Sequence, residues 1–209
     1  MALPFLQRSH HANARGRRCC CCLFSFFWKF LLAIAVLIGL TILIFWLLVQ
    51  PRAFKLHVTE ASLTQFNYTS NTLQYNLVLN FTARNPNKKL NIYYDKVEGH
   101  VFYDSVRFAS TDVITGKNSF RQYTKSTNRM SGVFSGKHVV VLDASDLKDD
   151  KRKGVFDIDV KLYFTIRFRL GDFIGGDTMA KAKCELEVPF RSKGTEVTAF
   201  QPTECDVDF

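Results

Sequence analysis

The N-terminal quarter of this chain has no acidic residue, because none of its 19 aspartates and glutamates precedes Glu60. Within that quarter, the twenty residues 30–49 (FLLAIAVLIGLTILIFWLLV) also lack any basic residue. A helix of this length rises about 30 Å, the thickness of the hydrocarbon core of a bilayer. It is apolar on every face, which argues against a buried core helix, and the lack of an A-x-A cleavage pattern argues against a signal peptide. The sequence therefore predicts one uncleaved membrane helix over 30–49.

Basic residues are unevenly distributed around this segment. Arg52 and Lys55 follow it, whereas five basic residues precede it: Arg8, Arg15, Arg17, Arg18 and Lys29. The more basic flank of a membrane helix stays in the cytoplasm, so we expect the N-terminus inside and the C-terminal part outside the cytosol. The net charge of +9 is thus partly a signal of membrane topology. No nucleic-acid-binding motif accompanies it, and no nucleic-acid partner is predicted.

Cysteine is scarce outside a single run. Four of the six cysteines are consecutive: Cys19, Cys20, Cys21 and Cys22. Adjacent cysteines diverge and lack the spacing of zinc ligands, so no metal site is predicted. Their place beside the membrane helix is typical of reversible S-palmitoylation, which we expect here. The alternative is that cysteine simply tolerates an interfacial position.

The other two cysteines, Cys184 and Cys205, fall on the apolar faces of predicted strands. Outside the reducing cytosol, a disulfide between them is chemically permitted. Two buried free thiols are the alternative, because sequence does not show whether their Cα atoms lie within about 7 Å of each other.

Signatures of catalysis are also lacking. There is no Gly-rich phosphate loop and no order of Ser, His and Asp or of Cys and His that indicates a nucleophile. Two Asp-x-Asp pairs, Asp157–Asp159 and Asp206–Asp208, match a motif of membrane-anchored glycosyltransferases, but each is accounted for as the polar face of an alternating strand. We predict no enzymatic activity, no catalytic residues, no cofactor and no metal.

Alternating apolar and polar residues fill most of the chain beyond residue 72. The clearest run, Phe156–Leu170, predicts a strand with one buried face, and its length predicts a bend or a strand shared by two sheets. One short helix is predicted at Ala144–Lys151, capped by Asp143, and residues 115–128 are predicted to be a loop. The predicted fold class is all-β: an antiparallel β-sandwich of immunoglobulin or fibronectin-III type with one short helix.

Four stretches carry a resemblance to a known family: NFTARNPNKKLNIYYDKVEGHVFYD (80–104), FDIDVKLYFTIRFRLG (156–171), KCELEVPF (183–190) and the final ECDVDF. They resemble the plant late-embryogenesis-abundant group 2 family, and within it the harpin-induced, hypersensitive-response-associated membrane proteins. The resemblance is most specific in two triplets: Asn85, Pro86 and Asn87, then Tyr93, Tyr94 and Asp95. It implies a non-enzymatic β-sandwich protein of the plant plasma membrane, linked to pathogen response and dehydration stress. Unlike some relatives, this chain is expected to carry no C-terminal lipid-anchor signal, since it ends without a hydrophobic tail.

The Asn85-Pro86-Asn87 motif also has a physical interpretation. An asparagine side chain can bond to nearby backbone, and proline cannot donate to a strand ladder. We therefore interpret the motif as a structural turn that ends one strand and directs Tyr93 and Tyr94 into the next, rather than as a ligand site.

Two non-enzymatic functions are compatible with the sequence. The first is a single-pass plasma-membrane protein of plant defence and stress response, whose extracellular domain binds a protein partner or a cell-wall component. The alternative is a membrane-organising tether or lipid-contact protein at contact sites or plasmodesmata. The segment GKNSFRQYTKSTNRM (116–130) bears on both, since Phe120 and Tyr123 lie among basic residues and an exposed apolar patch marks an interaction site. The oligomeric state is not predicted.

Two glycosylation sequons, at Asn67 and Asn80, lie in the part predicted to be outside the cytosol. Asn67 is expected in a polar turn and to be the better acceptor, whereas Asn80 is expected on the polar face of a strand. The predicted organisation is a basic, Cys-rich cytoplasmic tail (1–29), a membrane helix (30–49), a juxtamembrane strand and linker (50–71) and a β-sandwich domain (72–209).

Overall fold

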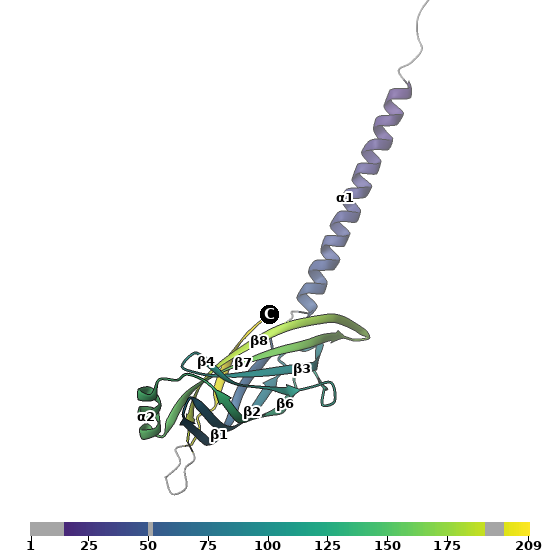
Figure 1. The fold of residues 1–209 in the computed structure, drawn as a ribbon. Helices are drawn as coiled ribbons and strands as arrows, with labels where there is room; N and C mark the ends of the chain where they lie inside the picture. Colours follow the sequence, from purple (N-terminus) through teal and green to yellow (C-terminus); the bar gives the residue numbers. More distant parts are fainter. Residues whose placement is uncertain (1–14, 50–51, 191–198) are drawn as a thin grey trace, which may run out of the picture. The chain divides into compact units, whose positions relative to one another are not determined.

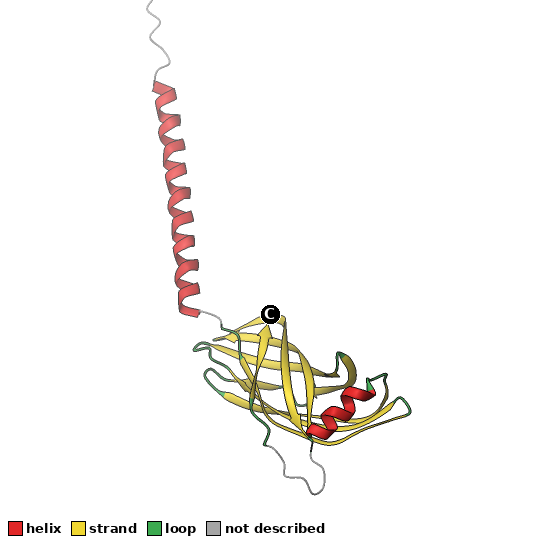
Figure 2. Ribbon diagram, turned by 90° about the vertical axis from the view of Figure 1, so that its left-hand side faces the viewer, coloured by secondary structure: helices red, strands yellow, loops and turns green. Residues whose placement is uncertain are grey.

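The computed structural model describes residues 15–49, 52–190 and 199–209. The chain forms two compact units, Met1–Val49 and Gln50–Phe209. The first contains the helix α1, and the second contains nine strands and the helix α2 (Figures 1 and 2).

Helix α1 spans Arg15–Val49. Its apolar part, Phe24–Leu47, is 24 residues long and is exposed along its length, so by length and composition α1 can cross a membrane. This part begins before the predicted Phe30 because the preceding aromatic residues extend the apolar surface, and Lys29 is the one charged residue among them. The four consecutive cysteines lie near the start of α1.

The strands of the second unit pair antiparallel in one continuous sheet of order β4-β3-β7-β8-β9-β1-β2-β6, with β5 beside β3. Their bounds are β1 Lys55–Thr69, β2 Thr72–Arg84, β3 Leu90–Tyr103, β4 Val106–Ile114, β5 Phe120–Gln122, β6 Thr127–Val139, β7 Val155–Leu170, β8 Phe173–Pro189 and β9 Thr203–Asp208. The all-β, antiparallel prediction is confirmed.

The sheet is nearly closed, which differs from the predicted immunoglobulin-like sandwich. Strand β9 joins the two halves, since Cys205 pairs with β1 and Val207 pairs with β8. At the other edge β4 lies against β6, and a Cβ built on Gly132 would lie 3.1 Å from Val113 Cγ2. Most of the strands have 13 or more residues, so their accumulated right-handed twist curls one sheet around a single core.

Period-two alternation places the core as predicted. In β7 the apolar side chains from Phe156 to Ile166 are buried, and the polar residues between them face outward. Strand β7 is not shared by two sheets, because it pairs with β3 and β8 along nearly its whole length. Both pairings contain a register shift. In the β7–β8 pairing it falls between Arg167 and Arg169 of β7, and in the β3–β7 pairing it falls between Tyr94 and Lys96 of β3.

Helix α2 spans Ala144–Lys153 and confirms the prediction of one short helix in this domain. The Asp143 side chain accepts the backbone N–H of Ser145 at 2.8 Å, and Gly154 ends the helix at φ 75°. Tyr103 Oη of β3 donates to Asp150 Oδ2 at 2.8 Å, which ties α2 to the sheet. Burial is the main cause that raises the pKa of Tyr103.

The predicted loop over residues 115–128 is wrong in part. It contains the three-residue strand β5 and the start of β6. Three residues are too few for alternation to be recognised. Strand β5 is fixed instead by a long-range bond, in which Gln122 Nε2 donates to the carbonyl of Ala83 at 2.7 Å.

Cys184 of β8 and Cys205 of β9 form a disulfide, with Cα atoms 4.4 Å apart. Both residues are buried in the core. The bridge fastens the last strand beside β8, at the place where β9 joins the two halves of the sheet.

Replacing both cysteines with alanine should lower the free energy of unfolding by about 3 kcal/mol, because the bridge closes a loop of 21 residues. Urea unfolding of the full chain in detergent measures the difference. Mass spectrometry of the unreduced protein is the control, and two alkylatable thiols at these positions would contradict the bridge.

Candidate functional site

The Asn85-Pro86-Asn87 motif connects β2 to β3, and both asparagines are buried. Asn85 Nδ2 donates to the carbonyls of Leu90 at 2.8 Å and Tyr123 at 3.2 Å. Asn85 Oδ1 accepts from the backbone N–H and the side-chain Nδ2 of Asn87, both at 3.0 Å. A buried amide with all these partners is a structural support, as the sequence interpretation held.

Asn87 fixes the chain as it leads into β1. The backbone N–H of Arg52 donates to Asn87 Oδ1 at 2.7 Å, and Asn87 Nδ2 donates back to the carbonyl of Arg52 at 2.7 Å. The two bonds form a clamp between residues 35 positions apart. We call this pair of bonds the Arg52 clamp.

A third buried amide, that of Gln122, continues the network. Tyr94 is buried, and its hydroxyl donates to Gln122 Oε1 at 3.0 Å. Burial raises the pKa of Tyr94. The ring of Phe120 stacks on Tyr94 with centroids 4.9 Å apart. Tyr94 of the family motif is therefore a core residue that holds β5 against β3.

Tyr93 points to the opposite, outer face of the sheet. It pairs with Arg121 of β5 on one side and Arg167 of β7 on the other. Arg169 Nη1 donates to the Tyr93 hydroxyl at 3.1 Å. This hydrogen bond from Arg169, with the nearby charge of Arg121, lowers the pKa of Tyr93.

Asp95 belongs to the same outer cluster. It accepts a bidentate bond from Arg167, with Nε and Nη2 each 2.7 Å from a carboxylate oxygen. The register shift between Tyr94 and Lys96 places Asp95 beside this arginine. Arg167 is thus neutralised within the protein.

Arg121 differs from its neighbours because no ion pair involves it among the described residues. Its guanidinium lies 4.6 Å from the ring centroid of Tyr123 and 5.7 Å from that of Tyr93. Its Nε is buried and, within the described part of the chain, has no hydrogen-bond partner. A guanidinium between two aromatic rings is suited to a phosphate or carboxylate.

Sequence reasoning identified Phe120 and Tyr123 in this region but missed Arg121 and Arg52. Tyr123 is exposed, as an interaction residue requires, whereas Phe120 packs against the core. The missing signal was long-range: Arg52 is held by Asn87, 35 positions away, and Arg121 lies beside Tyr93 of β3 as well as beside its near neighbour Tyr123.

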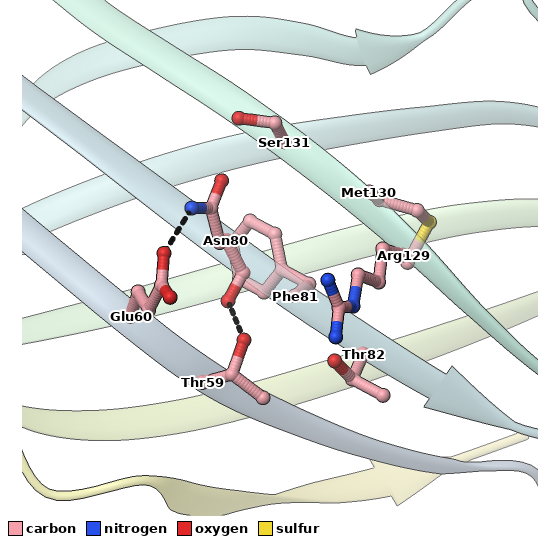
Figure 3. Close-up of a pocket in the computed structure, with 8 residues that line it drawn as sticks. All are labelled: Thr59, Glu60, Asn80, Phe81, Thr82, Arg129, Met130 and Ser131. Atoms are coloured by element: carbon pink, nitrogen blue, oxygen red, sulfur yellow. Dashed lines mark hydrogen bonds between the residues drawn. The ribbon is translucent and has the colours of Figure 1, made fainter.

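The two sequon asparagines lie on strands. Asn67 is an exposed residue of β1, and the turn that follows is Ser70-Asn71, so the predicted position of Asn67 in a turn is wrong. Asn80 lies in β2 and lines a shallow hollow over β1, β2 and β6 (Figure 3). There Asn80 Nδ2, the atom that a glycan would modify, donates to Glu60 Oε2 at 2.7 Å.

No group of three or more metal-ligating side chains exists among the described residues. Asp157 and Asp159 lie on β7, and Asp206 and Asp208 on β9. The side chains of the N-terminal cysteine run lie outside the described part of the structure, so its acylation stays a prediction.

A sequence profile of the late embryogenesis abundant protein family matches residues 80–196. NDR1/HIN1-like protein 10 of Arabidopsis thaliana is 40% identical, in an alignment that covers 99% of this chain and 92% of that protein. The chain belongs to the late embryogenesis abundant protein family.

Two further members are similar to this chain. NDR1/HIN1-like protein 3 of Arabidopsis thaliana is 42% identical over 88% of this chain and 80% of that protein. NDR1/HIN1-like protein 2 of Arabidopsis thaliana is 38% identical, in an alignment that covers 79% of this chain and 70% of that protein. A crystal structure of a protein from Archaeoglobus fulgidus aligns with a TM-score of only 0.29, which supports no conclusion.

Asn85→Ala should lower the free energy of unfolding by about 3 kcal/mol, because several buried polar groups lose their partner. Chemical unfolding of the full chain in detergent measures this loss. Lys88→Ala, at an exposed position in the same turn, is the matched control and should change stability by less than about 0.5 kcal/mol. Equal stabilities of the two variants would contradict the structural role of the motif.

Proposed function

We propose that this late embryogenesis abundant family member is a non-enzymatic, single-pass protein of the plant plasma membrane. Its β domain lies outside the cytosol and binds a protein partner or a cell-wall component during defence and stress responses. The observation that carries the proposal is the similarity to NDR1/HIN1-like protein 10 along nearly the whole chain.

Two features of the chain support this orientation. The residues before the apolar part of α1 include Arg8, Arg15, Arg17 and Arg18 and no acidic residue, which favours a cytoplasmic N-terminus. The Cys184–Cys205 bridge is typical of a domain that lies in an oxidising compartment.

The motif residues support a non-enzymatic role, because Asn85, Asn87 and Tyr94 are engaged in bonds that hold the fold.

Two modifications complete the proposal. Asn67 is the better glycan acceptor because it is exposed, whereas Asn80 Nδ2 is bonded to Glu60; loss of a glycosidase-sensitive mass shift in Asn67→Gln tests this. Acylation of Cys19–Cys22 requires that serine replacements abolish labelling by a palmitate analogue.

A peroxidase fused after Phe209, supplied with a membrane-impermeant phenol, should label cell-surface and wall proteins in plant tissue. The labelled set should change after pathogen challenge, because the domain is proposed to engage a defence partner. Mass spectrometry of the labelled proteins identifies the neighbours.

The same peroxidase fused before Met1 is the control and should give no labelling with the impermeant substrate. Labelling from the N-terminal fusion alone would overturn the orientation. An unchanged set of neighbours drawn from lipid-contact machinery would contradict partner binding in defence and favour the membrane-organising alternative.

A further inference from the structure

Basic and aromatic side chains gather at the end of the sheet that contains the Arg52 clamp. We call this surface the Arg52 rim; its members are Lys88, Lys89, Arg121, Tyr123, Arg169 and Phe173.

Backbone bonds and strand register hold the rim together. The carbonyl of Asn87, the clamp residue next to Lys88, accepts the backbone N–H of Lys125 at 3.1 Å. Asn91 pairs with Arg169, and its side chain accepts the backbone N–H of Thr124 at 3.1 Å. These contacts bring three turns to the same end of the sheet: the turn after β2, which holds Arg52, the turn after β5 and the β7–β8 turn.

The rim exposes aromatic rings. Tyr123 is 60% exposed, and Phe173, at the tip of the β7–β8 hairpin, is 74% exposed. On its β8 side the hairpin extends past β9, which pairs with β8 only at Lys181–Lys183 (Figure 1). Exposed aromatic rings beside basic groups are typical of surfaces that contact the headgroup region of a membrane.

The rim has positive charge that the protein leaves uncompensated. Among the described residues, no acidic side chain forms an ion pair with Lys88, Lys89 or Arg121. Asp172 faces Arg169 at 3.5 Å but is itself fully exposed. The guanidinium of Arg121 lies beside the rings of Tyr93 and Tyr123 and, among the described residues, is held by no carboxylate.

Covalent geometry limits how far the rim can lie from the membrane. Only three residue steps separate Val49, the last residue of α1, from Arg52. Such a segment spans at most about 11 Å, whatever the orientation of the domain. Because the Arg52 clamp fixes that residue to Asn87, the turn that contains Asn87 and Lys88 stays within a short chain length of the end of α1.

We propose that the Arg52 rim rests on the outer surface of the bilayer that α1 crosses. Its lysines and arginines bind lipid phosphate groups, and Tyr123 and Phe173 lie among the headgroups. The inference depends on the membrane anchoring proposed above and adds to it a contact that is separate from partner binding.

Quenching by lipid spin labels tests the proposal on the full chain in nanodiscs of phosphatidylcholine with phosphatidylglycerol. The four N-terminal cysteines are replaced with serine, and a bimane fluorophore is attached at Asp172→Cys on the rim or at Lys148→Cys on α2. Headgroup-level nitroxide lipid should quench the fluorophore at 172 strongly and the one at 148 little.

Lys88→Gln/Lys89→Gln/Arg121→Gln should reduce the quenching at 172, since each basic group near a charged bilayer is worth roughly fivefold in affinity. The matched control, Lys137→Gln/Lys148→Gln/Lys151→Gln, removes equal charge from exposed positions elsewhere and should leave it unchanged. Phe173→Ser, at an exposed position that folding does not need, should also reduce it.

Equal quenching at 172 and 148, or quenching that neither rim variant reduces, would overturn the proposal. A further outcome uses an acidic polysaccharide added to nanodiscs with a low or a high share of phosphatidylglycerol. If it abolished the quenching at 172 equally in both, the rim would bind the polymer and the proposal would be wrong. Failure of the chain to incorporate into nanodiscs would instead contradict the membrane anchor itself.

Discussion

The buried side-chain amides of Asn85, Asn87 and Gln122 are the constraint on which one end of this domain depends. Each joins segments far apart in the chain: Asn87 holds Arg52, Gln122 holds Ala83, and Asn85 holds the turn at Tyr123. Buried amides are costly unless their donors and acceptors are satisfied, so loss of one partner destabilises this end of the domain. The Asn85-Pro86-Asn87 motif is thus the junction where the chain following α1 joins the sheet.

The strand that follows this junction carries the second family triplet, Tyr93-Tyr94-Asp95, whose side chains lie on both faces of the sheet. Strand alternation sends Tyr94 inward to Gln122 and Tyr93 outward to Arg169. The inner residue stabilises the fold, while the outer one helps to place a group of arginines at the surface. The structure of the motif and the proposed contact of the rim therefore share one local geometry.

Local patterns in the sequence predicted the elements well. The alternation in Phe156–Leu170 fixes both the strand and its buried face, and Asp143 with Gly154 fixes the ends of α2. These features depend on neighbouring residues, so a single sequence contains them. The helix over residues 30–49 was equally clear, because a run of apolar residues long enough to cross a bilayer can be recognised from composition alone.

What the sequence did not contain was the pairing of distant segments. The immunoglobulin-like sandwich was predicted from strand number and spacing, yet closure depends on β9 joining β1 and β8 and on β4 meeting β6. The role of Arg121 was missed for the same reason, since its surroundings come from β3 and the turn after β5. Alternation determines which face of a strand is buried but not which strand lies beside it.

Hydrogen exchange at the amide of Arg52 tests the Arg52 clamp most directly. In the full chain in micelles, NMR should show this amide exchanging as slowly as those of the core strands, although it lies outside any strand. Asn87→Ala should accelerate its exchange by orders of magnitude more than that of the amide of Leu162 in β7. Rapid exchange at Arg52 in the unaltered protein, or a rate that Asn87→Ala leaves unchanged, would contradict a fixed junction between the anchor segment and the sheet.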